Sequence, residues 1–424
     1  MSWNLEQLLR ANAAVDDYKI RSDKTESYEL FFVHDKLETT RSTDTTETTV
    51  TVYVDHDGFR GDSSFKLYAA TTEAEAAQKI ADAVKKAGVI KNQMYALPEN
   101  ETLDGVVASN FTEMTPAALA KAMADAVFGA ELYAHGSINA LEIFVYRHVV
   151  SVKNSRGIDK RETKYSAMIE AIPTWNEGES VELYECQRFN RFDAAKVTAE
   201  IEQKMREVRD RAYAKAPAEK PACTVVLDAA ELAQLIGDIA YELDYATVYA
   251  GSNPFSIGHT VQKEPTGDKL NVTMRGMVEG SVASALFDAD GTTLVDTEVI
   301  RDGIVVDYCG SHRFAQYLER KTTGRLVCMD VAAGTLNDAE LAGKPYFRCV
   351  SMSGLQVDVY NDYIGGEVRL AYYCENGETV PMTGISISGK LSAALASMRL
   401  SAERTATGNY YGPKLAAFEG IEIV

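Results

Sequence analysis

The chain has 424 residues, with 43 lysines and arginines against 62 aspartates and glutamates, which gives a formal net charge of −19. This acidic excess disfavours a protein that grips nucleic acid or an anionic membrane, because both tasks need clustered positive side chains. No apolar run approaches the length of a membrane-spanning helix. The segment Met1–Arg10 is polar and amphipathic, so we expect no secretory signal.

The cysteines lie far apart in the sequence and form no CxxC pair. This spacing favours reduced thiols in a cytoplasmic protein over a disulfide framework. They are Cys186, Cys223, Cys309, Cys328, Cys349 and Cys374.

The first strand signals lie at residues 28–33 and 49–54, which are rich in β-branched and aromatic residues. The polar run between them, residues 36–48, predicts either an exposed strand or a loop. Alternating apolar residues in 141–149, a turn at 154–157 and a strand-like run at 164–172 repeat the same pattern later in the chain.

Each group of strands is followed by a predicted helix. Thr72 opens a capping-box pattern for a helix that ends at Gly88, and Thr115 followed by proline opens another. A longer helix begins at Asp193. The order strand, turn, strand, helix therefore occurs in residues 18–88 and again in 138–213, which suggests an internal duplication.

Residues 214–222 are polar, contain two prolines and predict a linker. We therefore divide the chain into an N-terminal mixed α/β domain, 1–216, and a C-terminal β-rich domain, 217–424. The second domain opens with a short strand and a helix over 228–243. It then contains three tight-turn dipeptides, at 290–291, 302–303 and 376–377, which are typical of hairpins. The predicted fold class is α+β, with a barrel- or sandwich-like second domain that carries one or two helices.

Few residues form a pattern typical of catalysis. No histidine pair has metal-ligand spacing, and no phosphate-binding glycine motif is present. Cys309 and His312 are close in sequence but need not meet in space. Asp238 and Glu242 lie four residues apart on one helix face. Two carboxylates so placed are compatible with three roles: binding a divalent cation, forming an acid–base pair, or making a solvated acidic surface.

From about residue 15 to its end, the sequence resembles the TldD/PmbA family, whose older name is "modulator of DNA gyrase". The resemblance rests on short segments that occur in the family's order and spacing. They are 152–157 (VKNSRG), 225–230 (VVLDAA), 287–291 (FDADG), 322–324 (TTG), 381–389 (PMTGISISG), 411–415 (YGPKL) and 418–420 (FEG).

The resemblance implies a two-domain α+β fold and a metallopeptidase built from two related subunits. TldD-like subunits carry a zinc-binding HExxxH on the helix after the VVL strand and a cysteine ligand near the C-terminus, whereas TldE/PmbA-like subunits lack the motif. Counted without gaps from the strand, the first histidine falls on Gly237, the glutamate on Asp238 and the second histidine on Glu242. No cysteine follows Cys374, so the last ligand is missing too.

The resemblance therefore implies a metal-free TldE/PmbA-like subunit with no catalytic residue and no cofactor of its own. We expect zinc in a TldD-like partner subunit, assembly as a heterodimer or as a homodimer, and unfolded peptides or modified peptide precursors as substrates. Our candidates for the peptide cleft are Asp238, Tyr241, Glu242, His259 and His312.

Two alternatives stay open. In the first, the chain is a stand-alone homodimer that binds peptides or has a regulatory role. In the second, it is a cryptic metallopeptidase that combines Asp238 and Glu242 with ligands such as His259 or His312. Despite the family's older name, the charge of −19 argues against direct contact with DNA. An acidic subunit beside a cleft would instead favour basic or neutral peptides.

Overall fold

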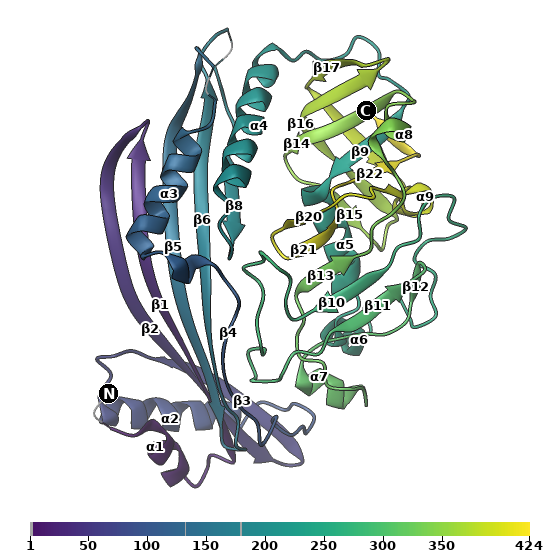
Figure 1. Cartoon of the computed structure of the whole chain (residues 1–424). Helices are drawn as coiled ribbons and strands as arrows, with labels where there is room; N and C mark the ends of the chain where they lie inside the picture. The colour runs from purple at the N-terminus through teal and green to yellow at the C-terminus, as the bar shows by residue number, and fades with distance from the viewer. Residues whose placement is uncertain (1–2, 132, 179) are drawn as a thin grey trace.

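The computed structural model describes residues 3–131, 133–178 and 180–424, and a long antiparallel sheet forms its N-terminal half (Figure 1). The strand order is β3-β2-β1-β5-β6-β4, with β7 and β8 also paired to β6. The bounds are β1 (Asp17–Val33), β2 (Lys36–His56), β3 (Phe59–Leu67), β4 (Thr102–Val106), β5 (Gly136–Asn154), β6 (Asp159–Trp175), β7 (Val181–Glu182) and β8 (Glu185–Phe189).

The predicted strands at 28–33, 49–54, 141–149 and 164–172 are confirmed as parts of β1, β2, β5 and β6, all of which are longer than predicted. The polar run 36–48 is strand, and most of its side chains are exposed. It lacks apolar alternation because neither face of β2 is deeply covered there. Sequence periodicity therefore detected only the half-buried stretches of these strands.

Among the described residues of this half, five helical segments accompany the sheet. They are α1 (Leu5–Ala11), α2 (Glu73–Ala87), the 3₁₀ turn η1 (Phe111–Glu113), α3 (Pro116–Phe128) and α4 (Ala194–Tyr213). The capping box is confirmed, because the Thr72 hydroxyl accepts a hydrogen bond from the Glu75 N–H and the Glu75 carboxylate accepts one from the Thr72 N–H. The C-cap is Gly88, as predicted.

Helices α3 and α4 cover one face of the upper sheet (Figure 1). They bury Leu141, Ile143 and Val145 of β5 against apolar residues of their own. The predicted apolar seam of α4, formed by Val197, Ile201, Met205 and Val208, is buried in this cluster. Hairpin and helix occur in both halves of the suspected repeat, with β1 and β5 antiparallel at the centre, but the duplication itself stays a prediction.

Two sheets and five helices make up the C-terminal half. One sheet has the order β12-β11-β10-β13-β21-β20, and the other has the order β19-β22-β9-β14-β16-β18-β23, with β15 and β17 also paired to β16. The strands are β9 (Thr224–Asp228), β10 (Val272–Arg275), β11 (Thr297–Arg301), β12 (Ile304–Val305), β13 (Cys328–Val331), β14 (Tyr346–Met352), β15 (Gln356–Asp358), β16 (Tyr363–Glu375), β17 (Glu378–Met382), β18 (Ile385–Gly389), β19 (Arg399–Leu400), β20 (Arg404–Thr407), β21 (Tyr410–Pro413), β22 (Leu415–Phe418) and β23 (Ile421–Ile423).

The α+β fold class is confirmed, but the number of helices predicted for the second half was too low. Besides α5 (Ala229–Tyr241), the described residues form α6 (Tyr245–Ala250), α7 (His312–Tyr317), α8 (Asp338–Leu341) and α9 (Leu391–Ser397). These four are too short to show an apolar period in the sequence. Helix α5 packs against strands of both sheets, so the half is two sheets around a helix and not a plain barrel.

Two of the three predicted hairpin turns are confirmed. Asp302 and Gly303 join β11 to β12, and Asn376 and Gly377 join β16 to β17, all with positive φ angles. The third pair, at 290–291, lies in a loop closed by a single bridge between Phe287 and Thr293 and does not link two strands. The dipeptide does mark a turn, but the residues on either side of it pair at one position only, so no hairpin forms.

The two halves meet at the lower end of the long sheet. An apolar cluster joins Val150, Val152 and Ile158 to Phe287, and beside it the buried Lys160 ammonium donates to Glu101 and to Thr293. The domain boundary at 216/217 stays a prediction.

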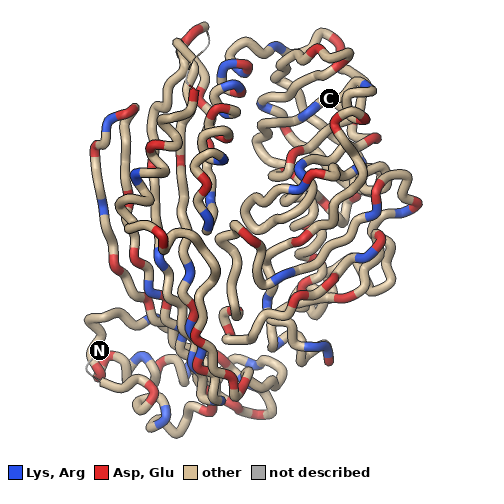
Figure 2. Tube along the Cα trace, in the orientation of Figure 1, with Lys and Arg blue, Asp and Glu red and all other residues tan. Residues whose placement is uncertain are grey.

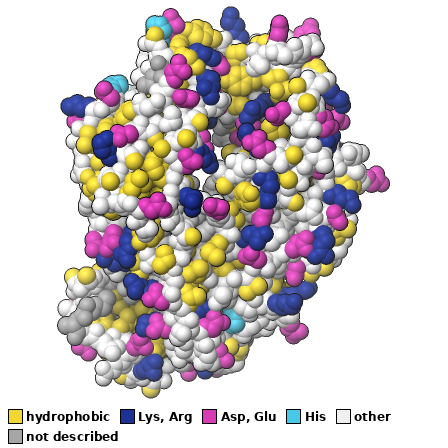
Figure 3. Space-filling view, in the orientation of Figure 1, with side chains coloured by type: hydrophobic (Ala, Val, Ile, Leu, Met, Phe, Trp, Pro, Cys, Tyr) yellow, Lys and Arg dark blue, Asp and Glu magenta, His cyan; other side chains and the backbone are white. Residues whose placement is uncertain are grey.

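Lysines and arginines are scattered among acidic residues over both halves (Figure 2). Figure 3 shows that the face is hollowed between the upper parts of the two halves. No helix in the described ranges is long and apolar enough to cross a membrane.

Candidate functional site

Helix α5 carries the positions that the resemblance assigns to zinc ligands. Its apolar stripe is buried in the C-terminal core, and β9 leads directly into its first turn. Asp228 occupies the N-cap position, but its side chain makes no cap hydrogen bond. It accepts hydrogen bonds from two nitrogens of Arg348, at 2.8 and 2.9 Å. This paired contact fixes the start of α5 to the neighbouring strand β14.

The residues at the three ligand positions lie in three different environments. Gly237 has no donor atom, and a methyl group there would meet Met329 Cε at 3.6 Å, an ordinary contact. Asp238 accepts a hydrogen bond of 2.8 Å from the Gln234 amide, one turn earlier on the helix. Glu242 is only 6% exposed and accepts a hydrogen bond of 2.8 Å from the Tyr360 hydroxyl.

The sequence did not identify Tyr360 as a partner of Glu242. It lies between β15 and β16, in a turn where the Asp358 carboxylate accepts hydrogen bonds from the backbone N–H groups of Tyr360 and Asn361. The hydrogen bond to Glu242 raises the pKa of the Tyr360 hydroxyl. An aspartate three residues before an asparagine predicts a turn, but no local signal pairs that turn with a helix 118 residues earlier.

Among the described residues, no side-chain hydrogen bond joins the other predicted cleft residues to Glu242 or Tyr360. Tyr241 is exposed, and the His259 ring packs 5.3 Å from the Phe255 ring. The His312 Nδ1 atom lies 3.2 Å from the Thr322 hydroxyl, and burial lowers the pKa of this imidazole. In the described residues, no side-chain hydrogen bond or ion pair joins any two of the five predicted cleft residues. Their role in a cleft stays a prediction.

The geometry does not favour a cysteine nucleophile near His312. The Cys309 thiol is buried, and burial together with Asp244 and Asp307 raises its pKa to about 12. A reactive cysteine needs a lowered pKa, because the thiolate is the nucleophile. The His312 imidazole contacts Thr322 instead.

The donor set around α5 does not fit zinc. A catalytic zinc site uses three protein ligands and a water. Here one ligand position is a glycine, and the carboxylates of Asp238 and Glu242 already accept hydrogen bonds from Gln234 and Tyr360. Across residues 3–131, 133–178 and 180–424, no group of three His, Cys, Asp or Glu side chains is arranged to hold a metal ion.

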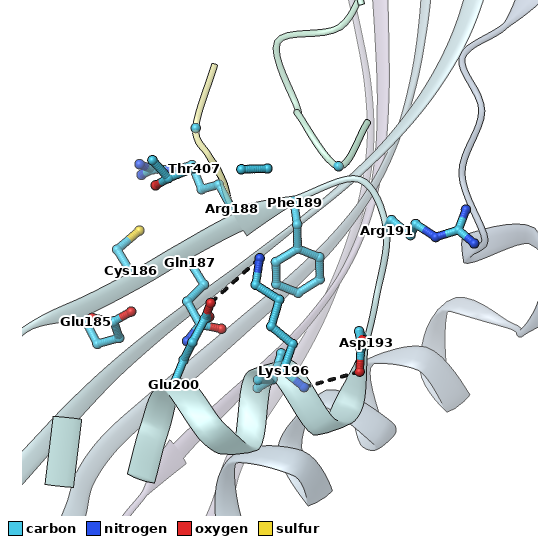
Figure 4. A pocket seen from close by; sticks show the side chains of 14 residues that line it. Glu185, Cys186, Gln187, Arg188, Phe189, Arg191, Asp193, Lys196, Glu200 and Thr407 are labelled. Carbon is cyan, nitrogen blue, oxygen red and sulfur yellow. Dashed lines mark hydrogen bonds and ion pairs between the residues drawn. The ribbon is translucent and has the colours of Figure 1, made fainter. Parts of the chain in front are cut away.

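A cavity of about 310 Å³ lies elsewhere, between β8, the first turns of α4 and the turn 406–408 of the C-terminal half (Figure 4). All five residues of β8 line it. Strand β8 pairs with β6 along one edge, and within the described part of the chain no strand pairs with its other edge. The cavity therefore lies beside a strand edge with free backbone hydrogen-bonding groups.

The Gln187 side chain is the unusual group in this cavity. It is only 8% exposed, and neither its Oε1 nor its Nε2 forms a hydrogen bond of good geometry with a described residue. The carboxyl groups of Glu185 and Glu200 line the same cavity (Figure 4). Burial raises the pKa of both carboxyls, and Lys204 and Lys196, respectively, oppose that rise.

Sequence reasoning did not single out this region. Residues 185–200 carry no motif, and a buried amide without a partner is invisible until the fold is known. The only available signal was the short strand-like run before Asp193. The cavity depends on a long-range approach of residues 406–408 to β8, which no local pattern reports.

The chain was compared with protein-family models and with known proteins. A family model described as the PmbA/TldA metallopeptidase C-terminal domain matches residues 220–424. No curated protein sequence matches the chain.

Three solved structures share the fold over almost the whole chain. TldE from Thermococcus kodakarensis has 15% sequence identity and a TM-score of 0.79, covering 99% of both chains. A protein described as a putative modulator of DNA gyrase, from Bacteroides thetaiotaomicron, has 14% identity and a TM-score of 0.79, covering 99% of this chain and 97% of its own. Another from Thermotoga maritima has 14% identity and a TM-score of 0.73, covering 99% and 98%. Residues 220–424, the part of the chain that carries α5, therefore resemble the C-terminal domain of the PmbA/TldA metallopeptidase family.

Proposed function

We propose that this protein is the non-catalytic, metal-free subunit of a cytoplasmic TldD/TldE-like metallopeptidase complex. In this proposal a TldD-like partner holds the zinc ion, and the complex degrades unfolded peptides or trims modified peptide precursors. The match of residues 220–424 to a metallopeptidase C-terminal domain supports a peptidase-related role. The finer assignment rests on one observation, the residues that occupy the ligand positions of α5.

Those residues are unsuited to hydrolysis. A zinc peptidase needs imidazole, carboxylate or thiolate ligands around an open coordination position for the attacking water. Position 237 supplies no atom, and the buried Glu242 carboxylate is oriented by the Tyr360 hydroxyl. A role left to this chain is to bind and orient the peptide and to keep it in an enclosed cleft. The likeness to TldE supports the fold of such a subunit and no more.

The first experiment measures metal and activity together. The chain is purified alone and with a TldD-like protein that carries HExxxH, and each sample is assayed for zinc and for cleavage of an unstructured peptide. The proposal predicts zinc and cleavage only in the sample that contains the partner. Stoichiometric zinc with cleavage by this chain alone would sink it.

A second experiment tests the partnership itself. The two chains are co-expressed with a tag on one of them, and complex formation is followed by pull-down and size-exclusion chromatography. We expect co-elution as a complex. If no complex forms and the TldD-like protein cleaves peptides equally well alone, the partner role is wrong and a stand-alone homodimer becomes the better account.

A further inference from the structure

We propose that the cavity between β8 and the turn 406–408 binds a short extended peptide and holds one of its lysine or arginine side chains near Glu185 and Glu200. The inference deepens the proposed function, on which it rests for the use made of the bound peptide. The binding itself is a property of this chain and can be measured without the partner.

The first step of the argument is the strand edge. Every residue of β8 lines the cavity, and the edge of β8 away from β6 has no strand partner in the described ranges. Unpaired backbone groups at a strand edge bind other extended chains by adding them to the sheet. The cavity volume of about 310 Å³ is at the small end of ligand sites and suits a few residues.

The second step is the Gln187 amide. A buried polar group without a hydrogen-bond partner is costly, and native proteins rarely retain one. The amide lies close enough to Glu185 to influence its pKa, but no hydrogen bond of good geometry forms between them. An amide has both donors and an acceptor, so it matches the N–H and C=O of a peptide group placed beside β8.

The third step is the balance of charge around the amide. Glu185 and Gln187 share one face of β8, and Lys204 lies 3.7 Å from Glu185 and 2.8 Å from Glu207. Glu200 forms an ion pair with Lys196, at 3.7 Å. Three carboxyl groups, those of Glu185, Glu200 and Glu207, therefore share the ammonium groups of Lys196 and Lys204, and one further cation would improve the balance.

The arginines of the cavity do not cancel this excess. Arg188 alternates to the opposite face of β8 from Gln187 and lies toward Thr407, and Arg191 points away from the other labelled residues (Figure 4). A bound cation beside Glu185 and Glu200 would lie near the ammonium groups of Lys196 and Lys204. Each of these already has a carboxylate partner.

The test uses fluorescently labelled six-residue peptides that differ only in one central residue, lysine, glutamine or glutamate. Fluorescence anisotropy with the full chain at low salt should show the lysine peptide binding about tenfold more tightly than the glutamate peptide, with a smaller difference at high salt. N-methylation of two central backbone nitrogens should weaken the lysine peptide strongly. Equal affinity of the three peptides, or no effect of N-methylation, would overturn the proposal.

Two variants assign the effect to this cavity. Gln187→Leu should lower the affinity for all three peptides about tenfold, while its unfolding temperature stays the same or rises because the unpaired amide is gone. The double variant Glu185→Gln with Glu200→Gln should bind the lysine and glutamine peptides equally. Glu73→Gln, an exposed change on α2, is the matched control and should leave binding unchanged.

Unchanged peptide binding by Gln187→Leu would contradict the proposal even if the protein is stable. A failure of the complex with a TldD-like subunit would leave these affinities intact. The two ideas can therefore fail separately.

Discussion

At the residue scale, Gly237 occupies the first of the ligand positions on α5, and its effect on stability can be measured. It lies within the helix, and a methyl group there would make only an ordinary contact with Met329. Glycine inside a helix costs conformational entropy that alanine does not.

We therefore expect Gly237→Ala to raise the free energy of unfolding by about 0.5–1 kcal/mol. Urea denaturation followed by circular dichroism measures this change. A loss of stability would mean that another group approaches this position more closely than the structure shows.

Glu231 leads to a prediction about pH. Burial raises the pKa of this carboxyl from 4.5 to about 7. The folded state therefore binds the proton more tightly than the unfolded state, so stability is highest below about pH 4.5 as far as this group is concerned and falls as pH rises toward 7. Glu231→Gln keeps the neutral form at every pH.

This variant should be more stable than the parent by about 3 kcal/mol at pH 8 and by less than about 1 kcal/mol at pH 5. Denaturation at the two pH values, with Glu73→Gln as control, provides the measurement. The same gain at both pH values would show that the carboxyl group is not the cause.

At the scale of elements, capping signals and half-buried strands could be predicted from the sequence because both are local. Thr72 and Thr115 marked true helix starts, and the alternation at 141–149 marked a true strand. What could not be predicted depends on contacts across the fold: the Tyr360 hydroxyl on Glu242, the Arg348 guanidinium on Asp228 and the cavity beside β8. The degenerate ligand positions were found only through the resemblance, since glycine and two acids form no motif.

Helix α3 offers a test of how much such a local signal contributes. The Thr115 hydroxyl accepts a hydrogen bond of 3.3 Å from the Ala118 N–H and satisfies a backbone donor in the first turn. Thr115→Ala should lower the free energy of unfolding by about 1 kcal/mol, while Thr115→Ser should keep most of it. Equal stability of the alanine and serine variants would show that packing of α3 on the sheet alone fixes its start.

At the scale of the whole molecule, one buried lysine helps to hold the two halves together. The Lys160 side chain is 1% exposed, whereas the side chain of its partner Glu101 is 52% exposed. Lys160 also donates a hydrogen bond of 2.6 Å to Thr293 in the other half. Loss of the two partners should therefore have unequal effects.

Glu101→Gln leaves a buried ammonium without its counter-charge and should cost about 3 kcal/mol, because the desolvation of Lys160 is no longer offset. Lys160→Met leaves a carboxylate that water can reach and should cost about 1 kcal/mol. Chemical denaturation of both variants measures the difference. A larger loss in Lys160→Met would contradict this description of the interface.

The net charge of −19 disfavours binding to DNA, and the proposed function requires a zinc-bearing partner. The most direct test is zinc content per complex, measured by mass spectrometry of metals on purified protein. We expect one zinc ion per complex with a TldD-like chain, none with this chain alone, and no change when Asp238 and Glu242 are both replaced by their amides. Zinc bound by this chain alone and lost in that double variant would contradict this expectation.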